Sequence, residues 1–377
     1  MKFSEIAGLE EEKNRLRTMV DSGKLPHAIL LHGPQGIGKT QLARAFVQYL
    51  NCTDRRNGDS CGRCPACLQT SKLNHPDVHF IYPVLKKKSD SPIYSKDYLE
   101  EWRNMLEKYP FMQQEKWAEQ IQAGNKQPII YVYDSDEIIR ISSLTSYSAA
   151  YKSFLIWQPE KMNLDAANKL LKVIEEPFSD TLFILVSNDE SKLLPTIRSR
   201  LQGIKVNPQT PEEVAAWLQK KYGGDSDYTL RIARIAEGNL VKAEELLKNE
   251  GENKEFTSCF IDMTRNSYAR KIEELRNLSE HFSGFGREKS LRMLAYFSRL
   301  VRENFIYNLK ISSLTAMTQE EEAFSRKFSP FINYRNVEKI SEEIDNAITD
   351  IGRNGNQKVI WFDFMLKLMV LLRSSQK

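Results

Sequence analysis

Residues 33–40, with the sequence GPQGIGKT, constrain the fold of this 377-residue chain more than any other segment. They match the pattern G-x-x-x-x-G-K-[ST]. They lie between a short apolar run at residues 28–31 and a run at residues 41–50 whose apolar residues recur at helical spacing. A strand, a glycine-rich turn and a helix in this order predict a phosphate-binding loop. The alternative is a glycine turn before a helix that binds nothing.

The residue types in this loop fit the chemistry of a nucleotide phosphate. Glycines let backbone N–H groups curl around a β-phosphate, and the helix N-terminus adds the positive end of its dipole. Lys39 can reach the β- and γ-phosphate oxygens, and Thr40 can offer its hydroxyl to Mg²⁺. We therefore predict a site for ATP or ADP with Mg²⁺ formed by Gly33, Gly36, Gly38, Lys39 and Thr40.

Hydrolysis of the nucleotide needs more than this loop. An acid at the end of a neighbouring strand must hold Mg²⁺, and a further residue must position the attacking water. The candidate strand instead runs into Gln158 and Pro159. Glu160 could substitute, although two residues further on it should point elsewhere, and Asp134 and Asp136 fit capping or turn positions. The sequence thus predicts a site that hydrolyses nucleotide poorly or not at all.

Four of the five cysteines gather in one short stretch with the spacing C-x8-C-x2-C-x2-C. This spacing brings four thiolates within reach of a tetrahedral zinc ion, at about 2.3 Å each, and leaves no open position for water. His75 and His79 offer a competing set with Cys64 and Cys67, and buried thiols without metal are the other alternative. Cys259 is expected to be a small core residue. We predict a structural Zn²⁺ site formed by Cys52, Cys61, Cys64 and Cys67.

Short apolar runs bounded by turn residues predict further strands, several of them separated by segments of helix length. This pattern predicts an α/β fold with a mostly parallel sheet covered on both faces. Residues 86–127 interrupt it with a polar insertion that opens on three lysines, for which a solvated loop and a nucleic-acid contact are the two interpretations. The apolar runs are residues 78–82, 129–133, 154–157, 182–186 and 203–206.

The second half of the chain changes to helices only. Residues 210–213, TPEE, predict a helix start with a capping box and a proline at the first helical position. A three-helix unit is expected at residues 208–249, a linker at 249–254 and amphipathic helices over 255–377. The apolar surface of residues 359–372 is too wide for a lone surface helix, so we expect it to pack against helices of its own domain or of a neighbouring subunit.

Charge and hydropathy narrow the class of protein. The chain has 54 Lys and Arg against 50 Asp and Glu, so any nucleic-acid contact must be a local patch or come from partners. No stretch approaches the roughly 18–20 consecutive apolar residues that span a bilayer, and the start, MKFSEIAGLEEE, lacks a secretory signal. Clustered cysteines are typical of metal ligands in a reducing compartment. We expect a soluble cytoplasmic protein without a membrane partner.

Three marks together make residues 3 to about 200 resemble the AAA+ clamp-loader subunits of bacterial DNA polymerase III. They are the cysteine spacing, the His75-Pro76-Asp77 that follows it, and the helix of residues 167–177, ANKLLKVIEEP. The resemblance implies an α/β P-loop AAA+ core, a small helical lid and an all-α collar or oligomerisation domain. Their expected bounds are residues 1–207, with the zinc module at 52–67 and the insertion at 86–127 inside it, then 208–249 and 255–377.

The resemblance also implies which residues for ATP hydrolysis this chain lacks and which it retains. In the family's catalytic subunits the strand after the insertion ends in Asp-Glu, where this chain has Gln158 and Pro159, and a nucleotide-sensing arginine stands where it has Val241. Residues 199–201, SRL, match the family's Ser-Arg-Cys motif and imply that Arg200 is a finger inserted into the ATP site of the adjacent subunit. Such a finger is worth about 10³–10⁵ in rate. From the residues alone, Arg200 could instead pair with a local carboxylate or lie in solvent.

The resemblance implies a structural subunit, or stator, of the DNA polymerase III clamp loader. Its partners would be the ATPase subunits and delta in a heteropentamer and, through that complex, the sliding clamp and primed DNA. The rival is a catalytically active clamp-loader ATPase subunit, with Glu160 or another acid in place of the missing pair. A zinc-dependent nucleic-acid-binding module is the third interpretation, disfavoured because the charge balance gives no large basic face.

Overall fold

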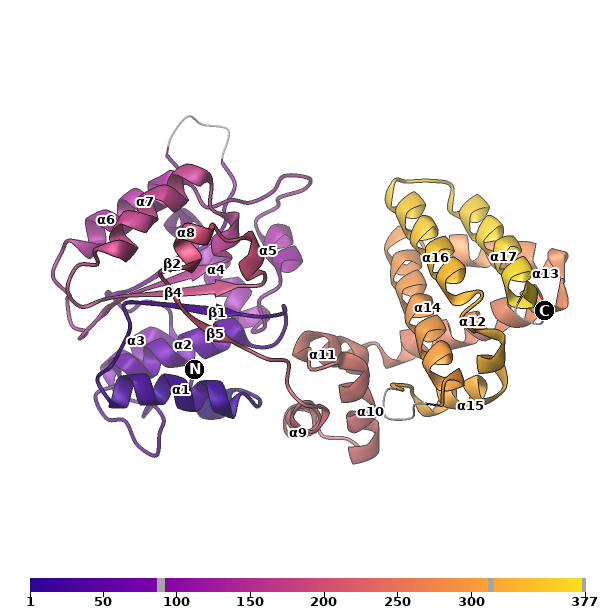
Figure 1. The fold of residues 1–377 in the computed structure, drawn as a ribbon, viewed down its shortest axis with the longest axis horizontal. Coiled ribbons are helices and arrows are strands. Elements are labelled where there is room, and N and C mark those ends of the chain that lie inside the picture. The colour runs from indigo at the N-terminus through magenta and orange to yellow at the C-terminus, as the bar shows by residue number, and fades with distance from the viewer. Residues whose placement is uncertain (87–91, 311–314, 375–377) are drawn as a thin grey trace. The chain divides into compact units, whose positions relative to one another are not determined.

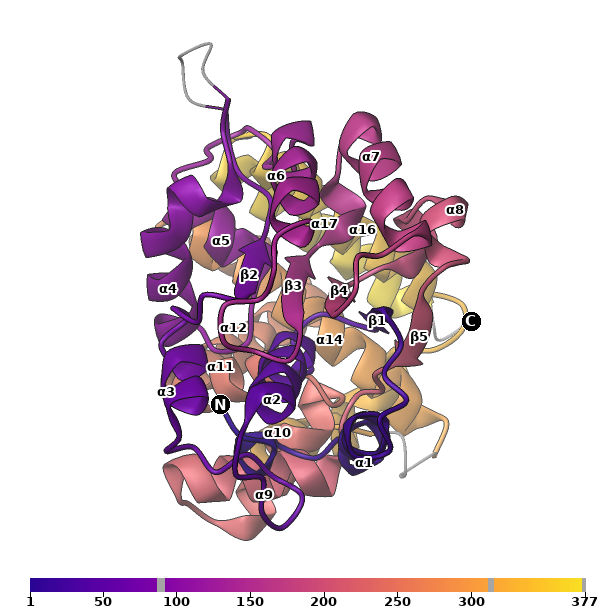
Figure 2. The same cartoon turned by 90° about the vertical axis from the view of Figure 1, so that its left-hand side faces the viewer.

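Five parallel strands form a sheet in the computed structural model, which describes residues 1–86, 92–310 and 315–374. Their order is β2-β3-β4-β1-β5, so the first strand along the chain lies between the fourth and the fifth (Figure 2). The register of β1 and β4 runs from Ala28↔Phe183 to His32↔Ser187. This confirms the predicted parallel sheet. The strands are β1 Ala28–His32, β2 Val78–Ile81, β3 Lys152–Trp157, β4 Thr181–Ser187 and β5 Gln202–Lys205.

Alternate residues of the central strands β1, β3 and β4 enter two different hydrophobic cores, because successive side chains of a strand point to opposite faces. Ile29 and Leu31 of β1 belong to a core shared with α1, α2 and α4, whereas Ala28 and Leu30 belong to one shared with α6 and α7. In Figure 2, α6 and α7 lie above the row of strands and α1 and α2 lie below it. The helices of this part are α1 Glu10–Asp21, α2 Lys39–Asn51, α3 Pro65–Ser71, α4 Leu99–Lys108, α5 Gln114–Gln120, α6 Val132–Ser142, α7 Leu164–Glu175 and α8 Pro195–Arg198.

The chain divides into two compact units. The first holds Met1–Tyr222 and Ala236–Ala243, including the sheet, and the second holds Gly223–Ile235 and the chain from Glu244 onward. After the sheet come α9 Pro211–Tyr222, α10 Ser226–Ala236 and α11 Leu240–Lys248. The predicted capping box at the start of α9 is confirmed, because the Thr210 N–H donates to Glu213 Oε2 at 2.8 Å and the Glu213 N–H donates to Thr210 Oγ1 at 3.3 Å.

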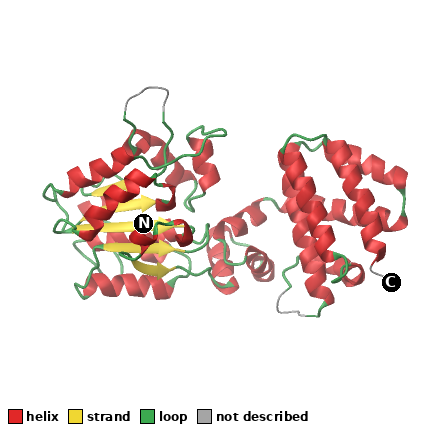
Figure 3. Cartoon of the chain, turned by 45° about the horizontal axis from the view of Figure 1, so that its top comes forward, coloured by secondary structure: helices red, strands yellow, loops and turns green. Residues whose placement is uncertain are grey.

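Helices alone form the described part of the second unit from α12 onward, as the orange-to-yellow part of Figure 1 and the red helices of Figure 3 show. The last of them, α17, buries Trp361, Met365 and Leu372 in a core shared with α12, α13, α14 and α16. Of the two alternatives left open for this helix, its own domain or a neighbouring subunit, the structure shows packing within its own domain. The bounds are α12 Glu250–Ala269, α13 Ile272–Ser283, α14 Arg287–Asn308, α15 Gln319–Phe328, α16 Val337–Gly352 and α17 Gln357–Ser374.

Two expectations about local structure are wrong. Residues 129–133 form no strand but two isolated bridges, Val84↔Ile129 and Ile130↔Met162, after which α6 begins. Residues 249–254 form no linker but the first turns of α12. Their charges are paired on a solvated helix, since Lys254 contacts Glu250 at 2.8 Å and Arg292 of α14 contacts Glu252 at 2.7 Å.

The structure describes the lysine run and the predicted insertion only in part. Lys87 and Lys88 of the lysine run, and with them residues 87–91 of the predicted insertion, lie outside the described residues. Within the described ranges, no helix has the length and apolar character that crossing a membrane requires.

Candidate functional site

The predicted phosphate loop lies between β1 and α2, and its glycines are required by space. A Cβ atom on Gly33 would stand 2.3 Å from the carbonyl oxygen of Val206, a backbone atom that cannot give way. A Cβ atom on Gly36 would stand 2.3 Å from Asn239 Oδ1, and the φ of Gly36 is 83°, in the left-handed region that favours glycine. The chain can therefore wind this tightly only with the predicted glycines.

Lys39, the lysine of the loop, is 4% exposed and turns its ammonium group onto the loop itself. Its Nζ donates to the carbonyl oxygen of Gly33 at 2.8 Å and to that of Pro34 at 2.5 Å. Burial lowers the pKa of Lys39 to about 8, and the nearby charge of Glu160 acts in the opposite direction. The side chain is therefore mostly protonated at neutral pH, and its charge is held by carbonyl groups that a phosphate could replace.

Two amide side chains that sequence reasoning missed hold the loop in shape. The buried Gln209 donates from Nε2 to the carbonyl oxygen of Ile37 at 2.8 Å. Asn239 donates from Nδ2 to the carbonyl oxygen of Gln35 at 3.2 Å. Both lie far along the chain from the loop, so no local pattern in the sequence could have indicated them. They hold the carbonyl groups of Ile37 and Gln35 in hydrogen bonds.

That cavity brings together four of the five predicted loop residues. Gly36, Gly38, Lys39 and Thr40 line it, together with Trp157 and Asn188 at the ends of β3 and β4 and with Pro110–Met112 of the insertion. Gly33 lies behind Lys39 and accepts its hydrogen bond. The volume of the cavity is about 10 Å³, which is close to the room that one water molecule needs.

The end of β3 carries Gln158 where an ATPase of this kind needs an acid. Gln158 is 2% exposed, and its backbone is left-handed with a φ of 54°. Its Nε2 donates to Gln114 Oε1 at 3.4 Å, so the insertion engages the amide. Because an amide carries no negative charge, it gives Mg²⁺ no carboxylate at this strand end.

Glu160 does not point away from the site, so the expectation about its direction is wrong. The left-handed Gln158 and the short turn Pro159–Lys161 fold the chain back, and Glu160 Oε1 accepts the Asn188 N–H at 3.1 Å. Its Oε2 is buried and has no hydrogen-bond partner among the described residues. Since its charge acts on Lys39, this acid lies within electrostatic reach of the loop.

Asp134 and Asp136 serve other purposes than the loop. Asp134 Oδ1 accepts the Ser95 N–H at 2.8 Å, and burial raises the pKa of this carboxyl to about 6. Asp136 forms an ion pair with Lys169 at 2.5 Å. Neither aspartate lines the cavity of the loop. Both lie within α6, after its N-cap Tyr131, so the expectation of capping or turn positions is wrong.

The cysteine cluster is built by a hairpin and a helix start. Arg56 and Asp59 exchange backbone hydrogen bonds of 3.0 and 2.9 Å around Asn57 and Gly58, whose φ values are both positive, as a two-residue hairpin turn requires. This turn returns the chain from Cys52, at the end of α2, to Cys61. The proline after Cys64 then starts α3, which carries Cys67. Asp59 also accepts the N–H groups of Phe3 and Ser4 at 3.0 Å.

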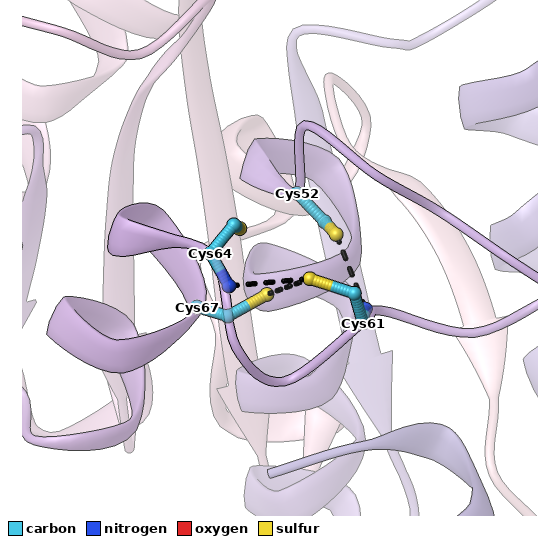
Figure 4. Close-up of side chains that lie close together, drawn as sticks. All are labelled: Cys52, Cys61, Cys64 and Cys67. Atoms are coloured by element: carbon cyan, nitrogen blue, oxygen red, sulfur yellow. Dashed lines mark hydrogen bonds between the residues drawn. The ribbon is translucent and has the colours of Figure 1, made fainter.

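The sulfur atoms of the four cysteines fit a single ion. All lie within 4.8 Å of one another, and Cys61 Sγ and Cys67 Sγ are 3.9 Å apart (Figure 4). A tetrahedral Zn²⁺ with bonds of about 2.3 Å places its sulfurs about 3.8 Å apart. The N–H groups of Arg63 and Cys64 lower the pKa of the Cys61 thiol, which favours the thiolate that a metal needs. The residues present therefore fit a closed, structural zinc site.

The competing set with two histidines is not assembled. His75 Nδ1 accepts the Asp77 N–H at 3.1 Å, and the ring of His79 stacks on Phe154 at 5.1 Å. Burial lowers the pKa of His79 to about 4. Among the described residues, the cluster that could hold a metal contains cysteines alone.

Arg200 lies at the surface after α8 and is engaged within the chain. Its side chain is 39% exposed, NH2 contacts Glu175 Oε1 at 2.6 Å and NH1 donates to the carbonyl oxygen of Thr196 at 2.8 Å. The structure thus shows the ion pair with a local carboxylate that the sequence left open. The guanidinium group is accessible to solvent in this position. Val241, in the first turns of α11, has an aliphatic side chain and offers no charge to a phosphate.

Comparison with known proteins places the chain in a family. Residues 8–210 match the family described as "DNA polymerase III, delta subunit", which is more than half of the chain, and the chain belongs to this family. The resemblance to the clamp-loader subunits of DNA polymerase III, and among them to delta-prime, is therefore confirmed.

Individual relatives carry the names delta-prime and gamma/tau. The DNA polymerase III subunit delta' of Pseudomonas aeruginosa is 30% identical over 46% of this chain, and that of Bacillus subtilis is 25% identical over 73%. A gamma/tau subunit of Mycobacterium tuberculosis is 26% identical over 58% of this chain. The matches span 41%, 70% and 31% of these relatives, respectively.

Solved structures with a similar course of the chain include a gamma subunit-related protein of Thermotoga maritima. It is 14% identical, with a TM-score of 0.39, over 95% of this chain and 99% of that one. The RuvB branch migration motor of the same organism is 16% identical, with a TM-score of 0.37, over 64% of this chain and 61% of that one.

Proposed function

We propose that this chain is a structural subunit of the DNA polymerase III clamp loader that binds nucleotide without hydrolysing it. The observation that carries the proposal is a contrast between two strand ends. The loop after β1 keeps Lys39 and Thr40, whereas β3 ends in Gln158 and Pro159. Without a carboxylate at that end, neither Mg²⁺ nor an attacking water has its usual partner.

Such a subunit would act in the cytoplasm as a stator. It would hold its neighbours, the ATPase subunits and delta, in a heteropentameric ring and assist loading of the sliding clamp onto primed DNA. Membership of the family supports this assembly. The core of residues 1–207, the lid of 208–249 and the collar of 255–377 are the domains we propose for it, with the collar joining the ring.

Arg200 is the residue through which this subunit would take part in chemistry. We propose that it leaves Glu175 and enters the ATP site of the adjacent subunit, where it neutralises charge that develops on the γ-phosphate. Its exposure and its place after a short helix support this role. A chain without a working site of its own can supply such an arginine, because the finger acts in trans.

The zinc site is proposed as a structural element of the same subunit. Cys52, Cys61, Cys64 and Cys67 would hold Zn²⁺ and close the loop after α2. With four protein ligands the ion would bind no substrate and contribute to folding only.

A second candidate function, ATP hydrolysis by the chain itself, is favoured by Glu160. Its unpartnered Oε2 and its effect on Lys39 place one carboxylate near the loop, where the sequence predicted none. The acid lies two residues beyond the usual position, and Asn188 already uses its other oxygen. We therefore rank this function below the first.

Phosphate release separates the two functions. We expect the purified chain to release no phosphate from ATP above background, alone or with primed DNA. Sustained turnover that is lost in both Lys39→Ala and Glu160→Gln would overturn the stator proposal and establish the second candidate. The Lys39→Ala variant is also the control, because a contaminating ATPase would remain active in it.

A further inference from the structure

A segment of the insertion covers the phosphate loop. Pro110, Phe111 and Met112 belong to the wall of the same small cavity as Lys39 and Thr40. Phe111 and Met112 are only 6% and 5% exposed, although they lie between α4 and α5 and not in a helix or strand. Pockets that bind small molecules and cofactors have volumes of about 300–1,000 Å³. The volume of this cavity is about 10 Å³. In this conformation the segment leaves no room for a nucleotide.

Phe111 also lines a second, larger cavity, as do Pro110 and Gln41. The second cavity has a volume of about 640 Å³ and is lined by Gly8, Phe111 and Trp217 among others. The ring of Phe111 stands edge-on to that of Trp217, with centroids 5.3 Å apart and planes at 81°, a favourable aromatic geometry. Because Pro110 and Phe111 line both spaces, displacement of the segment that carries them would open the loop cavity toward the larger one.

Two polar contacts clamp the segment onto the loop and onto β3. Gln35, within the loop, donates from Nε2 to Glu115 Oε2 at 3.0 Å. Gln158 donates from Nε2 to Gln114 Oε1 at 3.4 Å. Glu115 is exposed, so water can take over its hydrogen bond without leaving a buried polar group unsatisfied. The contact of Glu115 can therefore open at little cost, whereas the buried Gln158 needs a new partner when Gln114 leaves it.

Helix α5, which follows this segment in the chain, limits how much of the insertion can move. Trp117 of α5 is 1% exposed, donates from Nε1 to the Pro83 carbonyl oxygen at 2.7 Å and stands edge-on to Trp102 at 5.4 Å. These contacts fix α5 from Trp117 onward to the core of the first unit. The movable segment is thus residues 110–115, which we call the cap; it consists of the residues before α5 and the first two residues of that helix.

We propose that the cap closes the phosphate loop in the free chain and is displaced when ADP or ATP with Mg²⁺ binds. Lys39 fits this arrangement, because with the cap closed its ammonium is satisfied by the carbonyl oxygens of Gly33 and Pro34. Nucleotide binding would then exchange Phe111 for ligand and free Gln158 from Gln114. The proposal rests on the proposed function only in that the loop must be a nucleotide site. If the cap moves in this way, nucleotide binding at a non-hydrolysing site changes the conformation of the insertion, and partner proteins can respond to that change.

The test measures binding of ADP carrying a fluorescent N-methylanthraniloyl group, with Mg²⁺, to the full chain. A closed cap lowers the apparent affinity by the fraction of open molecules, so Phe111→Ala should tighten binding about tenfold or more. Met105→Ala is the matched control. Met105 is fully buried in the core that also holds Met112 of the cap, but it does not line the loop cavity, so its truncation should leave the affinity unchanged.

The outcomes distinguish this proposal from the proposed function. If the wild-type chain binds the probe as tightly as Phe111→Ala does, the cap is overturned while the nucleotide site stands. If neither binds, or if Lys39→Ala in the Phe111→Ala background binds equally well, the nucleotide site and the cap are both overturned. Tighter binding in Phe111→Ala that depends on Lys39 supports both.

A second variant keeps the proposal testable if Phe111→Ala does not fold. Glu115→Ala removes an exposed side chain of the clamp and should tighten probe binding about threefold, by raising the open fraction. Glu119→Ala, on the same helix but paired with Lys116 at 2.9 Å, should not change it. Hydrogen exchange gives an independent measure. The amides of residues 111–115 should exchange faster when ADP is added, and unchanged or slower exchange would contradict the cap.

Discussion

Lys39 shows how one residue can be held ready for a phosphate. A lysine has an ordinary pKa near 10.5, and burial in the loop lowers it to about 8. The two carbonyl oxygens that accept from Nζ stabilise the charged form but do not offset the loss of water completely. A bound phosphate would add negative charge beside Nζ and so raise the pKa again. Binding of nucleotide should therefore be linked to the protonation of this side chain.

We predict that nucleotide affinity falls as the pH rises through 8. The free chain loses the proton of Lys39 above that pH, and only the protonated form attracts phosphate, so affinity should fall about tenfold between pH 7.5 and 9. Titration with the fluorescent ADP over this range measures the effect. Lys39→Arg is the control, because a guanidinium keeps its charge throughout. Equal losses of affinity in both proteins would show that another group titrates.

At the scale of elements, the conformation of the cysteine loop depends on the contacts that hold it to the rest of the chain. The hairpin at Asn57 and Gly58 brings Cys61 back to Cys52, and Asp59 holds the whole loop to the N-terminal residues Phe3 and Ser4. The loop buries little apolar side chain of its own. A bound metal would therefore contribute much of what keeps it ordered.

Removal of metal should loosen this element. We expect one Zn²⁺ per chain by elemental analysis, lost in Cys61→Ser. Structural zinc sites contribute about 10–16 kcal/mol in small peptides, so the metal-free protein should melt on the order of 5 °C lower or more. Cys259→Ser is the control, because Cys259 lies in α12, outside the cluster, and should keep the ion. A chain without metal, whose melting is the same with and without a chelator, would contradict the site.

Spacing and local pattern could predict the elements that depend on neighbouring residues. The phosphate loop, the four-cysteine cluster and the capping box of α9 follow from residues close in sequence. The bridge residues around Ile129 misled the prediction, because an apolar run does not say how many residues will pair. Gln209 and Phe111 could not be found at all. Their contacts with the loop join residues far apart in sequence, and only the fold decides them.

At the scale of the whole molecule, the proposed nucleotide site and the proposed arginine finger differ in their access to solvent. The loop is buried under the cap and lacks a carboxylate at Gln158, whereas Arg200 is accessible. With 54 basic against 50 acidic residues, the chain has too little excess charge to bind DNA over a broad face. Both observations favour a protein that works through an assembly. Its part in catalysis must therefore be measured in the complex and not in the isolated chain.

We predict that Arg200→Ala leaves the clamp loader assembled but slows ATP hydrolysis at the adjacent site. The pair of Arg200 with Glu175 at 2.6 Å is half-exposed, and such surface pairs are worth about 0–1 kcal/mol. The arginine can therefore exchange this partner for the stronger charge of a γ-phosphate. In a complex whose other ATP sites carry a substituted loop lysine, primed DNA should stimulate hydrolysis about 10³-fold less with Arg200→Ala. Arg198→Ala is the control, because Arg198 is an exposed arginine at the end of the short helix that precedes Arg200. An unchanged rate with Arg200→Ala, in a complex of normal size on gel filtration, would remove Arg200 from the catalytic site.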